Sequence, residues 1–467
     1  MTPEAPITRA PEPVAADTAV LRALRRIRVP QTQRNRELGL LLFALLINAA
    51  AVTLVELGTG RAPDVQVFVF GAVPALLALT LHVVLRLRAR DADPFVLPIA
   101  TLLTGLGMAE IYRIDIAVNL SGWDAASTKQ LVWSILALAF ALAVVLSLRN
   151  YRVLFRYTYL FGLAGVLLLI LPFIPGLGTD QNANVWVSVG GLFQFQPGEI
   201  AKIALAIFFA GYLVRTRESL TSTGTRFLFM TWPRARELGP LLIIWLISLG
   251  IIVLQRDLGT GLLLFGMFVA MLYVATGKTS WVLIGVVLAV GGALAASRVL
   301  PYVQARFENW LDAFNPDLVN GNSYQLVQGI FGLAQGGLIG TGLGQGRPNV
   351  TPLSQSDYIL PSLGEELGLV GVFAILALYM VFTSRGIRIG LAGQDDFGKL
   401  LATGLSFTIA LQVFIMVGGV TRLIPLTGLT TPFLTAGGSS LISNWIIVAL
   451  LLRISDAVRS RPRVVIG

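Results

Sequence analysis

The sequence predicts an all-α polytopic membrane protein with about twelve transmembrane helices. Hydrophobic residues make up 55% of its 467 residues and charged residues only 13%, about half the charged fraction of a soluble domain. Apolar runs of roughly 20 residues recur along the chain, and a helix of that length, rising ~1.5 Å per residue, crosses ~30 Å of hydrocarbon. The third observation is a biased distribution of positive charge, which sets the direction of the spans.

The chain divides into a polar tail followed by apolar segments. Residues 1–36 are rich in Pro, Ala and Arg, show no apolar periodicity and are expected to form a disordered tail. Because the number of segments after it is even, both termini are expected on one side of the membrane. The segments are centred on 38–57, 65–86, 95–112, 130–148, 154–174, 199–214, 239–255, 258–276, 280–297, 359–383, 399–420 and 437–454.

Positive residues place that side in the cytoplasm. Of the 35 Lys and Arg residues, 26 lie in the N-terminal tail, in or beside the even-numbered connections, or at the C-terminal end, whose tail is residues 456–467. Lys and Arg accumulate on the cytoplasmic side of membrane proteins, so both termini are expected to be cytoplasmic. The net charge of +10 therefore reflects topology and attraction to anionic lipids, and we expect no nucleic-acid partner.

Residue counts exclude several kinds of chemistry. Cysteine is absent and His82 is the only histidine, so disulfides, thiolate catalysis and metal sites built from histidine or cysteine clusters are excluded. His82 lies inside an apolar run, where packing or a helix-end contact is expected. A metal ion here would be a hard cation held by carboxylates and substrate phosphates. No organic cofactor is expected.

The predicted topology places the unusual loops on the outer face. Asn184 to Glu199 contains two short β-prone runs joined by Gly-Gly, which predicts a small hairpin before the sixth span. The segment from Leu300 to Tyr358, between spans nine and ten, is long, polar and dense in glycine, and structured loops of this length usually have a function. Within it, Gly336 to Gly346 follows no strand, so we expect close backbone packing or a short re-entrant element rather than a nucleotide site.

Two ionisable residues begin the sixth span. Glu199 and Lys202 are separated by three positions and so share one helical face. Charges at membrane depth usually point into a protein cavity. A structural ion pair and a substrate-facing lysine fit this spacing equally well.

A second polar cluster separates spans seven and eight. Gln255, Arg256 and Asp257 form a tight turn in which Asp257 would cap the next helix. Arg256 is a candidate contact for an anion.

Acidic residues gather around the start of the tenth span. Asp357 precedes a proline that is typical of a first helical turn, so it lies at the outer mouth of the span. There a carboxylate can cap the helix, or act on a substrate head group whose lipid tail stays in the membrane; chemistry alone does not separate these alternatives. Glu365 and Glu366 lie deeper, and we expect them to support the helix by bonding other helices.

Five separate motifs occur in one order along residues 95–455. Together they resemble the SEDS family (shape, elongation, division and sporulation), the RodA- and FtsW-type peptidoglycan polymerases. The motifs are FQPGEIAK (195–202), QRDLGTG (255–261), GNSYQLVQGIFGLAQGGLIGTGLGQG (321–346), SDYILPSLGEELGLVG (356–371) and LIPLTGLTTPFLTAGGSSL (423–441).

The resemblance has departures as well as matches. Gln355 stands where many members have His, and Thr435-Ala436 replaces the usual Ser-Tyr. The two spans within residues 37–93 are additional to the common ten-span core, which we assign to residues 94–455. These spans favour the elongation (RodA-like) branch, and a division (FtsW-like) role stays open.

The resemblance implies that Asp357 is the essential catalytic acid, and it gives functional weight to Glu199, Lys202 and Trp186. The implied reaction is inverting transfer of the lipid II disaccharide to a growing glycan strand, with Asp357 as general base. The diphosphate leaving group would need positive charge. A divalent cation (Mg²⁺ or Mn²⁺) or the outer-side cations could supply it; these cations are Lys202, Arg256, Arg347 and Arg422.

The resemblance also implies partners and a location. The partners are lipid II, the nascent strand, membrane lipids and a class B penicillin-binding transpeptidase; the location is the bacterial cytoplasmic membrane. Two rival functions share the topology: a lipid II flippase or other transporter, and a scaffold that only recruits partners. Incubating the purified protein with labelled lipid II and a divalent cation separates the three.

Overall fold

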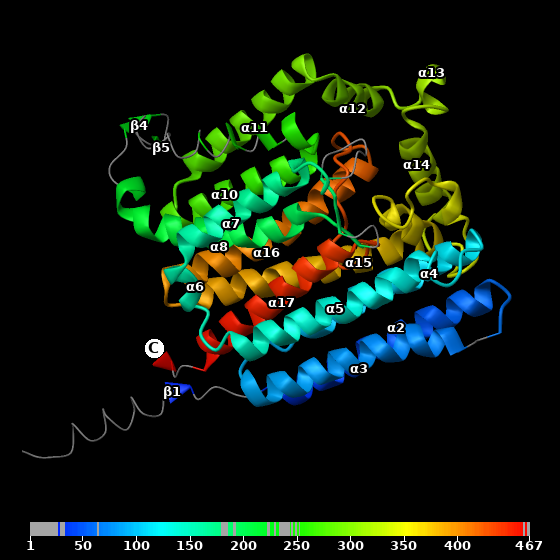
Figure 1. Cartoon of the computed structure of the whole chain (residues 1–467), viewed down its shortest axis with the longest axis horizontal. Coiled ribbons are helices and arrows are strands. Elements are labelled where there is room, and N and C mark those ends of the chain that lie inside the picture. The colour runs from blue at the N-terminus through cyan, green and yellow to red at the C-terminus, as the bar shows by residue number, and fades with distance from the viewer. Residues whose placement is uncertain are drawn as a thin grey trace, which may run out of the picture.

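The computed structural model describes residues 27–28, 33–62, 65–178, 185–189, 193–221, 225–227, 230–232, 243, 246–247, 250–251, 253–460 and 463–464. Its long helices run side by side in one direction, as expected for a bundle that crosses a membrane (Figure 1).

The helices come first in the chain order. They are α2 (Arg34–Gly58), α3 (Val65–Arg88), α4 (Val96–Ala117), α5 (Ala126–Ser147), α6 (Val153–Arg156), α7 (Thr158–Ile170), α8 (Pro197–Thr221), α10 (Leu258–Thr276), α11 (Thr279–Val299), α12 (Pro301–Leu311), α13 (Pro316–Val319), α14 (Tyr324–Gly336), α15 (Ile359–Ala392), α16 (Asp396–Val420) and α17 (Gly438–Arg459). Short 3₁₀ turns are η1 (Leu171–Phe173) and η2 (Pro348–Val350). The strands are β1 (Ile27–Arg28), β2 (Val187–Val189), β3 (Phe193–Phe195), β4 (Thr225–Phe227), β5 (Met230–Trp232) and β6 (Arg463–Val464).

The helical membrane fold is confirmed, and the exact number of spans stays a prediction. Nine helices within the described ranges are long and apolar enough to cross a membrane: α2, α3, α5, α8, α10, α11, α15, α16 and α17. Helix α4 has a similar length, but Glu110 and Arg113 lower the hydropathy of its last turns. The fifth expected span is the shorter helix Thr158–Phe173. Much of the seventh, 239–255, lies outside the described residues.

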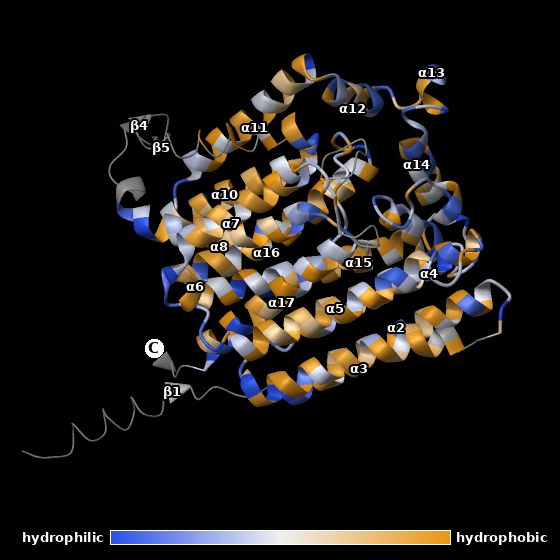
Figure 2. Ribbon diagram, in the orientation of Figure 1, coloured by the Kyte–Doolittle hydropathy of each residue, from blue (hydrophilic) through white to orange (hydrophobic). Residues whose placement is uncertain are grey.

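Burial separates central helices from peripheral ones. About three quarters of the apolar windows of α8, α16 and α17 are buried, against 28% for α2 and 17% for α11. The peripheral helices expose large apolar side chains such as Phe43, Phe68 and Val287. Figure 2 shows this apolar colouring along the sides of the bundle, with polar residues at its ends. An apolar surface of this extent is stable only against lipid.

The two ends of the bundle carry different elements. The chain termini meet at one end, where β1 pairs antiparallel with β6 through Ile27 and Val464. At the opposite end lie α12, α13, α14 and the glycine-rich loop of residues 337–347 (Figure 1). An even number of crossings accounts for the shared side of the termini, and it leaves the large loop on the other side.

The expected hairpin before α8 is present. Val187 pairs with Phe195 and Val189 with Phe193, in antiparallel register. The backbone N–H of Gln196 then donates to Ser439 Oγ of α17 over 2.7 Å. This contact fixes the start of α8 against α17.

Helix α15 is broken at Gly368. This residue has φ +70° and ψ −176°, a conformation that favours glycine. The break frees backbone groups on both sides, and the glycine-rich loop binds them. Thr341 and Gly342 donate to the carbonyls of Glu365 and Glu366, while Leu369 donates to Gly337 O. Irregular backbone is tolerated in a membrane protein when it is satisfied in this way, so the loop is a packing element as expected.

A Gly368→Ala substitution is expected to destabilise the fold strongly. Its Cβ would lie 2.3 Å from the backbone nitrogen of Gly340, and the positive φ adds strain of about 1–3 kcal/mol. We expect a clear fall in the unfolding temperature in detergent. The control is Gly291→Ala in α11, where a Cβ meets nothing within 4 Å; equal melting of the two variants would contradict this reading of the break.

Candidate active site

Asp357 lies immediately before α15, at the end of the bundle that carries the large loop. The residue that caps α15 is Tyr358, and it forms no side-chain cap hydrogen bond. Within the described part of the chain, no hydrogen-bond donor contacts the Asp357 carboxylate. The capping alternative is therefore wrong, because the carboxylate is left free for another partner.

Arg306 of α12 and Gly428 lie beside this carboxylate. A Cβ on Gly428 would be 3.7 Å from Asp357 Oδ2 and 3.9 Å from Arg306 Nη1. Arg306 Nη1 also donates to Leu426 O over 2.8 Å, which holds the guanidinium in place. Burial raises the pKa of Asp357 to about 6, Arg306 opposes this rise, and Asp257 adds to it. Such a carboxyl accepts and releases a proton near neutral pH.

Asp257 occupies the other side of the same region. Its carboxylate caps α10, accepting from Thr260 N over 3.0 Å and from Thr260 Oγ1 over 2.6 Å. Burial raises its pKa, while the Thr260 hydrogen bonds and Arg306 lower it. Both carboxylates therefore lie in the field of Arg306, from two different helices.

Glu199 and Lys202 form a buried ion pair under this region. Lys202 Nζ contacts Glu199 Oε2 at 2.5 Å and also donates to Gln412 over 3.1 Å and Asn444 over 3.3 Å. Ser443 donates to Glu199 Oε2 over 3.1 Å. The pair joins α8, α16 and α17. Because the lysine charge is compensated by Glu199, little positive charge is left for a substrate anion.

An apolar groove begins next to the polar centre. It has a volume of about 400 Å³ and lies between α10, α11, α12 and the segment after α16. Its lining includes Leu258, Phe307 and Leu426, which are neighbours or partners of Asp257 and Arg306. An almost wholly apolar groove ending at charged groups suits a ligand with a lipid tail and a polar head.

The remaining sequence-predicted cations lie in different surroundings. Arg256 is exposed, with φ +55°, in the turn before Asp257. Arg347 is exposed in the glycine-rich loop, and its backbone N–H donates to Glu365 Oε1 over 2.7 Å. Arg422 donates to the carbonyls of Trp310 and Leu311. The guanidinium of Arg422 holds the end of α12, so its observed contacts are structural.

Trp186 and the two glutamates lie outside the polar centre. Trp186 is half-buried just before β2. Glu366 accepts from Gly344 N, Gly346 N and Arg113 Nε at 2.8, 3.2 and 2.9 Å. Both glutamates thus bind the glycine-rich loop, which keeps their charges away from lipid.

Sequence reasoning did not single out Arg306 or Thr430. Arg306 is the cation closest to Asp357 in its effect, and Thr430 Oγ1 donates to Glu199 Oε1 over 3.3 Å. A signal for Arg306 was present, because it is the single Lys or Arg of the amphipathic stretch 301–311. Thr430 lies in a Thr-rich loop in which no pattern distinguishes one hydroxyl from another.

The family model of the FtsW, RodA and SpoVE cell cycle proteins matches residues 94–460. The chain belongs to this family. Among relatives, peptidoglycan glycosyltransferase RodA of Mycobacterium tuberculosis (strain H37Rv) is 44% identical over 92% of this chain and 93% of its own length. The probable peptidoglycan glycosyltransferase FtsW of Geobacter metallireducens is 32% identical over 79% and 96%.

Solved structures have the same fold. A chain described under "Structural coordination of polymerization and crosslinking by a peptidoglycan synthase complex" matches with a TM-score of 0.61 and 24% identity, covering 79% of this chain and 98% of that one. The rod shape determining protein RodA of Thermus thermophilus matches with a TM-score of 0.52 and 22% identity, covering 78% and 96%. Helices α2 and α3 precede the segment matched by the FtsW, RodA and SpoVE model.

Proposed function

We propose that this chain is a peptidoglycan glycosyltransferase that polymerises lipid II into glycan strands on the outer face of the bacterial cytoplasmic membrane. The observation that carries the proposal is the position of Asp357 and Arg306 beside the apolar groove. The relatives named peptidoglycan glycosyltransferase support it. Higher identity to RodA than to FtsW relatives favours a role in elongation over division.

Each part of lipid II has a matching environment. The polyprenyl tail would lie in the groove, whose lining is apolar. The diphosphate would meet Arg306 and the exposed Arg256, since Lys202 is neutralised by Glu199. The disaccharide would then reach Asp357 at the water-side mouth.

The proposed step is an inverting displacement. Asp357 takes the proton from the acceptor sugar hydroxyl as its oxygen bonds to the donor anomeric carbon. The bond from that carbon to the diphosphate oxygen breaks, and the polyprenyl diphosphate leaves with the electron pair. Arg306 and Arg256 would stabilise the negative charge on the leaving group. One free carboxylate suits this route, because a retaining route requires a second one as nucleophile.

A divalent cation fits this site only together with substrate. Within the described part of the chain, no three acidic or histidine side chains form a metal-binding group. Mg²⁺ is commonly held by one or two carboxylates plus substrate phosphates, and Mn²⁺ accepts the same oxygen ligands. Asp257 and Asp357 would be the protein ligands, and the cation would add positive charge at the diphosphate.

The polymerisation rate is expected to rise with pH and reach half its maximum near pH 6. The base must be ionised, and the pKa of Asp357 is raised to about 6. Arg306 lowers that pKa, so Arg306→Gln should move the midpoint to higher pH. Initial rates of the purified protein from pH 5 to 8 measure this. Arg306→Lys, which keeps the charge, is the control; a midpoint unchanged in Arg306→Gln would contradict the pairing.

A transpeptidase partner and cytoplasmic termini complete the proposal. The solved chain that matches with a TM-score of 0.61 belongs to a peptidoglycan synthase complex that coordinates polymerisation with crosslinking, which supports a class B penicillin-binding protein as partner. The shared side of β1 and β6 and the excess of Lys and Arg on that side support cytoplasmic termini.

Purified protein with labelled lipid II in vesicles tests the function directly. We expect glycan polymer in the presence of Mg²⁺ or Mn²⁺. Movement of lipid II across the vesicle without polymer would instead identify a flippase. Neither activity, with and without the transpeptidase, would leave only a scaffold.

A further inference from the structure

We propose that α2 and α3, the two helices outside the matched family segment, position the segment that carries Asp357. The inference rests on the proposed function for its kinetic test. The contacts run from α2 to the glycine-rich loop of residues 337–347, and from that loop to the broken helix α15.

The first contact joins two glycines. A Cβ on Gly58, the last residue of α2, would lie 2.1 Å from Leu343 O and 3.0 Å from Gly344 Cα. In return, a Cβ on Gly344 would lie 2.8 Å from Val55 O and 3.0 Å from Gly58 Cα. Gly344 also has φ +83°. The end of α2 and the loop therefore touch backbone to backbone, and neither position has room for a side chain.

The second contact joins the loop to the first part of α15. Gly344 N donates to Glu366 Oε2 over 2.8 Å, and Thr341 N donates to Glu365 O over 3.0 Å. Because Gly368 breaks the helix, residues 359–367 form a short piece with Asp357 just before its start. The rest of α15 holds this piece weakly across the break, so the loop sets much of its orientation.

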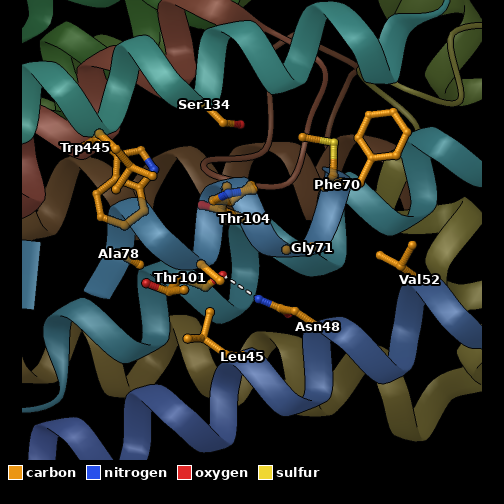
Figure 3. Close-up of a pocket in the computed structure, with 15 residues that line it drawn as sticks. Leu45, Asn48, Val52, Phe70, Gly71, Ala78, Thr101, Thr104, Ser134 and Trp445 are labelled. Carbon is orange, nitrogen blue, oxygen red and sulfur yellow. Dashed lines mark hydrogen bonds between the residues drawn. The ribbon is translucent and has the colours of Figure 1, made fainter. Parts of the chain in front are cut away.

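Helix α4 provides a parallel connection. Tyr112 donates to Glu56 of α2, and Arg113 on the next position binds Glu366 Oε1 at 2.9 Å and Gly346 O at 2.6 Å. Further along, Asn48 of α2 donates to Thr101 O over 3.0 Å, beside a small cavity of about 30 Å³ (Figure 3). Polar contacts of this kind fix α2 against the core at both the middle and the outer end.

The consequence is a dependence of the reaction rate on a helix that does not contact substrate. A misplacement of about 1 Å in a reacting group can lower a rate by about 10²-fold. A displaced Leu343 carbonyl would shift the loop, then Glu366, and with it the piece that begins after Asp357. Gly58 is therefore a positioning residue.

The variant Gly58→Val tests this in the full-length protein. We expect kcat for lipid II polymerisation to fall about 10- to 100-fold, with KM within about threefold, since the groove of α10, α11 and α12 is remote from α2 in the chain of contacts. Gly39→Val is the matched control, since a Cβ at this position of the same helix meets nothing within 4 Å. Equal kcat in the two variants, at equal membrane abundance, overturns the inference.

A conformational measurement separates this inference from the proposed function. The chain has no cysteine, so Gln345→Cys, at an exposed loop position, takes a single nitroxide label. Greater label mobility in Gly58→Val than in Gly39→Val supports the inference, even if the wild type makes no polymer and the proposed function fails. Unchanged mobility overturns it, including when kcat falls, because the loss would then have another route.

Discussion

Asp357→Asn is expected to lower glycan polymerisation by about 10²- to 10⁴-fold, the usual contribution of general-base catalysis. The amide keeps the shape of the side chain and removes its ability to take a proton. No described group donates a hydrogen bond to this carboxylate, so the fold should tolerate the change. Initial rates with labelled lipid II, at equal protein abundance, measure the effect.

The control for this variant is Asp317→Asn. Asp317 is an exposed aspartate of the same outer segment, on α13, and the same substitution there should leave the rate unchanged. If Asp357→Asn retains wild-type polymerisation, Asp357 is not the base. If both variants lose activity together, the loss belongs to the loop as a whole.

Lys202→Met is expected to destabilise the protein by about 3–5 kcal/mol, because it leaves Glu199 charged and buried without its partner. The Lys202 side chain is only 2% exposed and that of Glu199 only 7%. The double variant Glu199→Gln with Lys202→Met should recover much of the loss, because it removes both charges. Reversible denaturant unfolding in detergent, followed by tryptophan fluorescence, measures the differences.

The exposed pair of Arg217 and Asp396 is the comparison for this ion pair. Their separation is 2.6 Å, but both side chains are 45% exposed. Arg217→Met should therefore change the unfolding free energy by less than about 1 kcal/mol. A Lys202→Met loss as small as this would show that the buried pair is not part of the stabilising core.

The bundle, its long outer loop and the hairpin could be predicted from sequence because each has a local signal. Apolar length predicts a span, and Gly-Gly between β-prone runs predicts the turn before α8. The spacing of Glu199 and Lys202 likewise indicates a shared face. Spacing cannot say what the lysine faces, and the answer lies in Gln412 and Asn444, which come from helices more than 200 residues away.

The environment of Asp357 was beyond sequence reasoning for the same reason. Whether it caps α15 depends on the angle at which the loop enters the helix. Its closest cation, Arg306, comes from a different part of that loop. The break at Gly368 was also unpredicted, because a glycine inside an apolar run is common in membrane helices and only its partner Gly340 shows why it is needed.

The groove beside α10 has a consequence for how a substrate would arrive. Two of its lining residues, Val290 and Leu294, are also 55% exposed on the apolar side of the bundle. The groove is thus continuous with the surface that faces lipid. A tailed substrate could diffuse sideways within its own leaflet and enter without leaving the bilayer. The search for the enzyme would then be two-dimensional, and capture would depend on how many such molecules that leaflet holds rather than on their concentration in water.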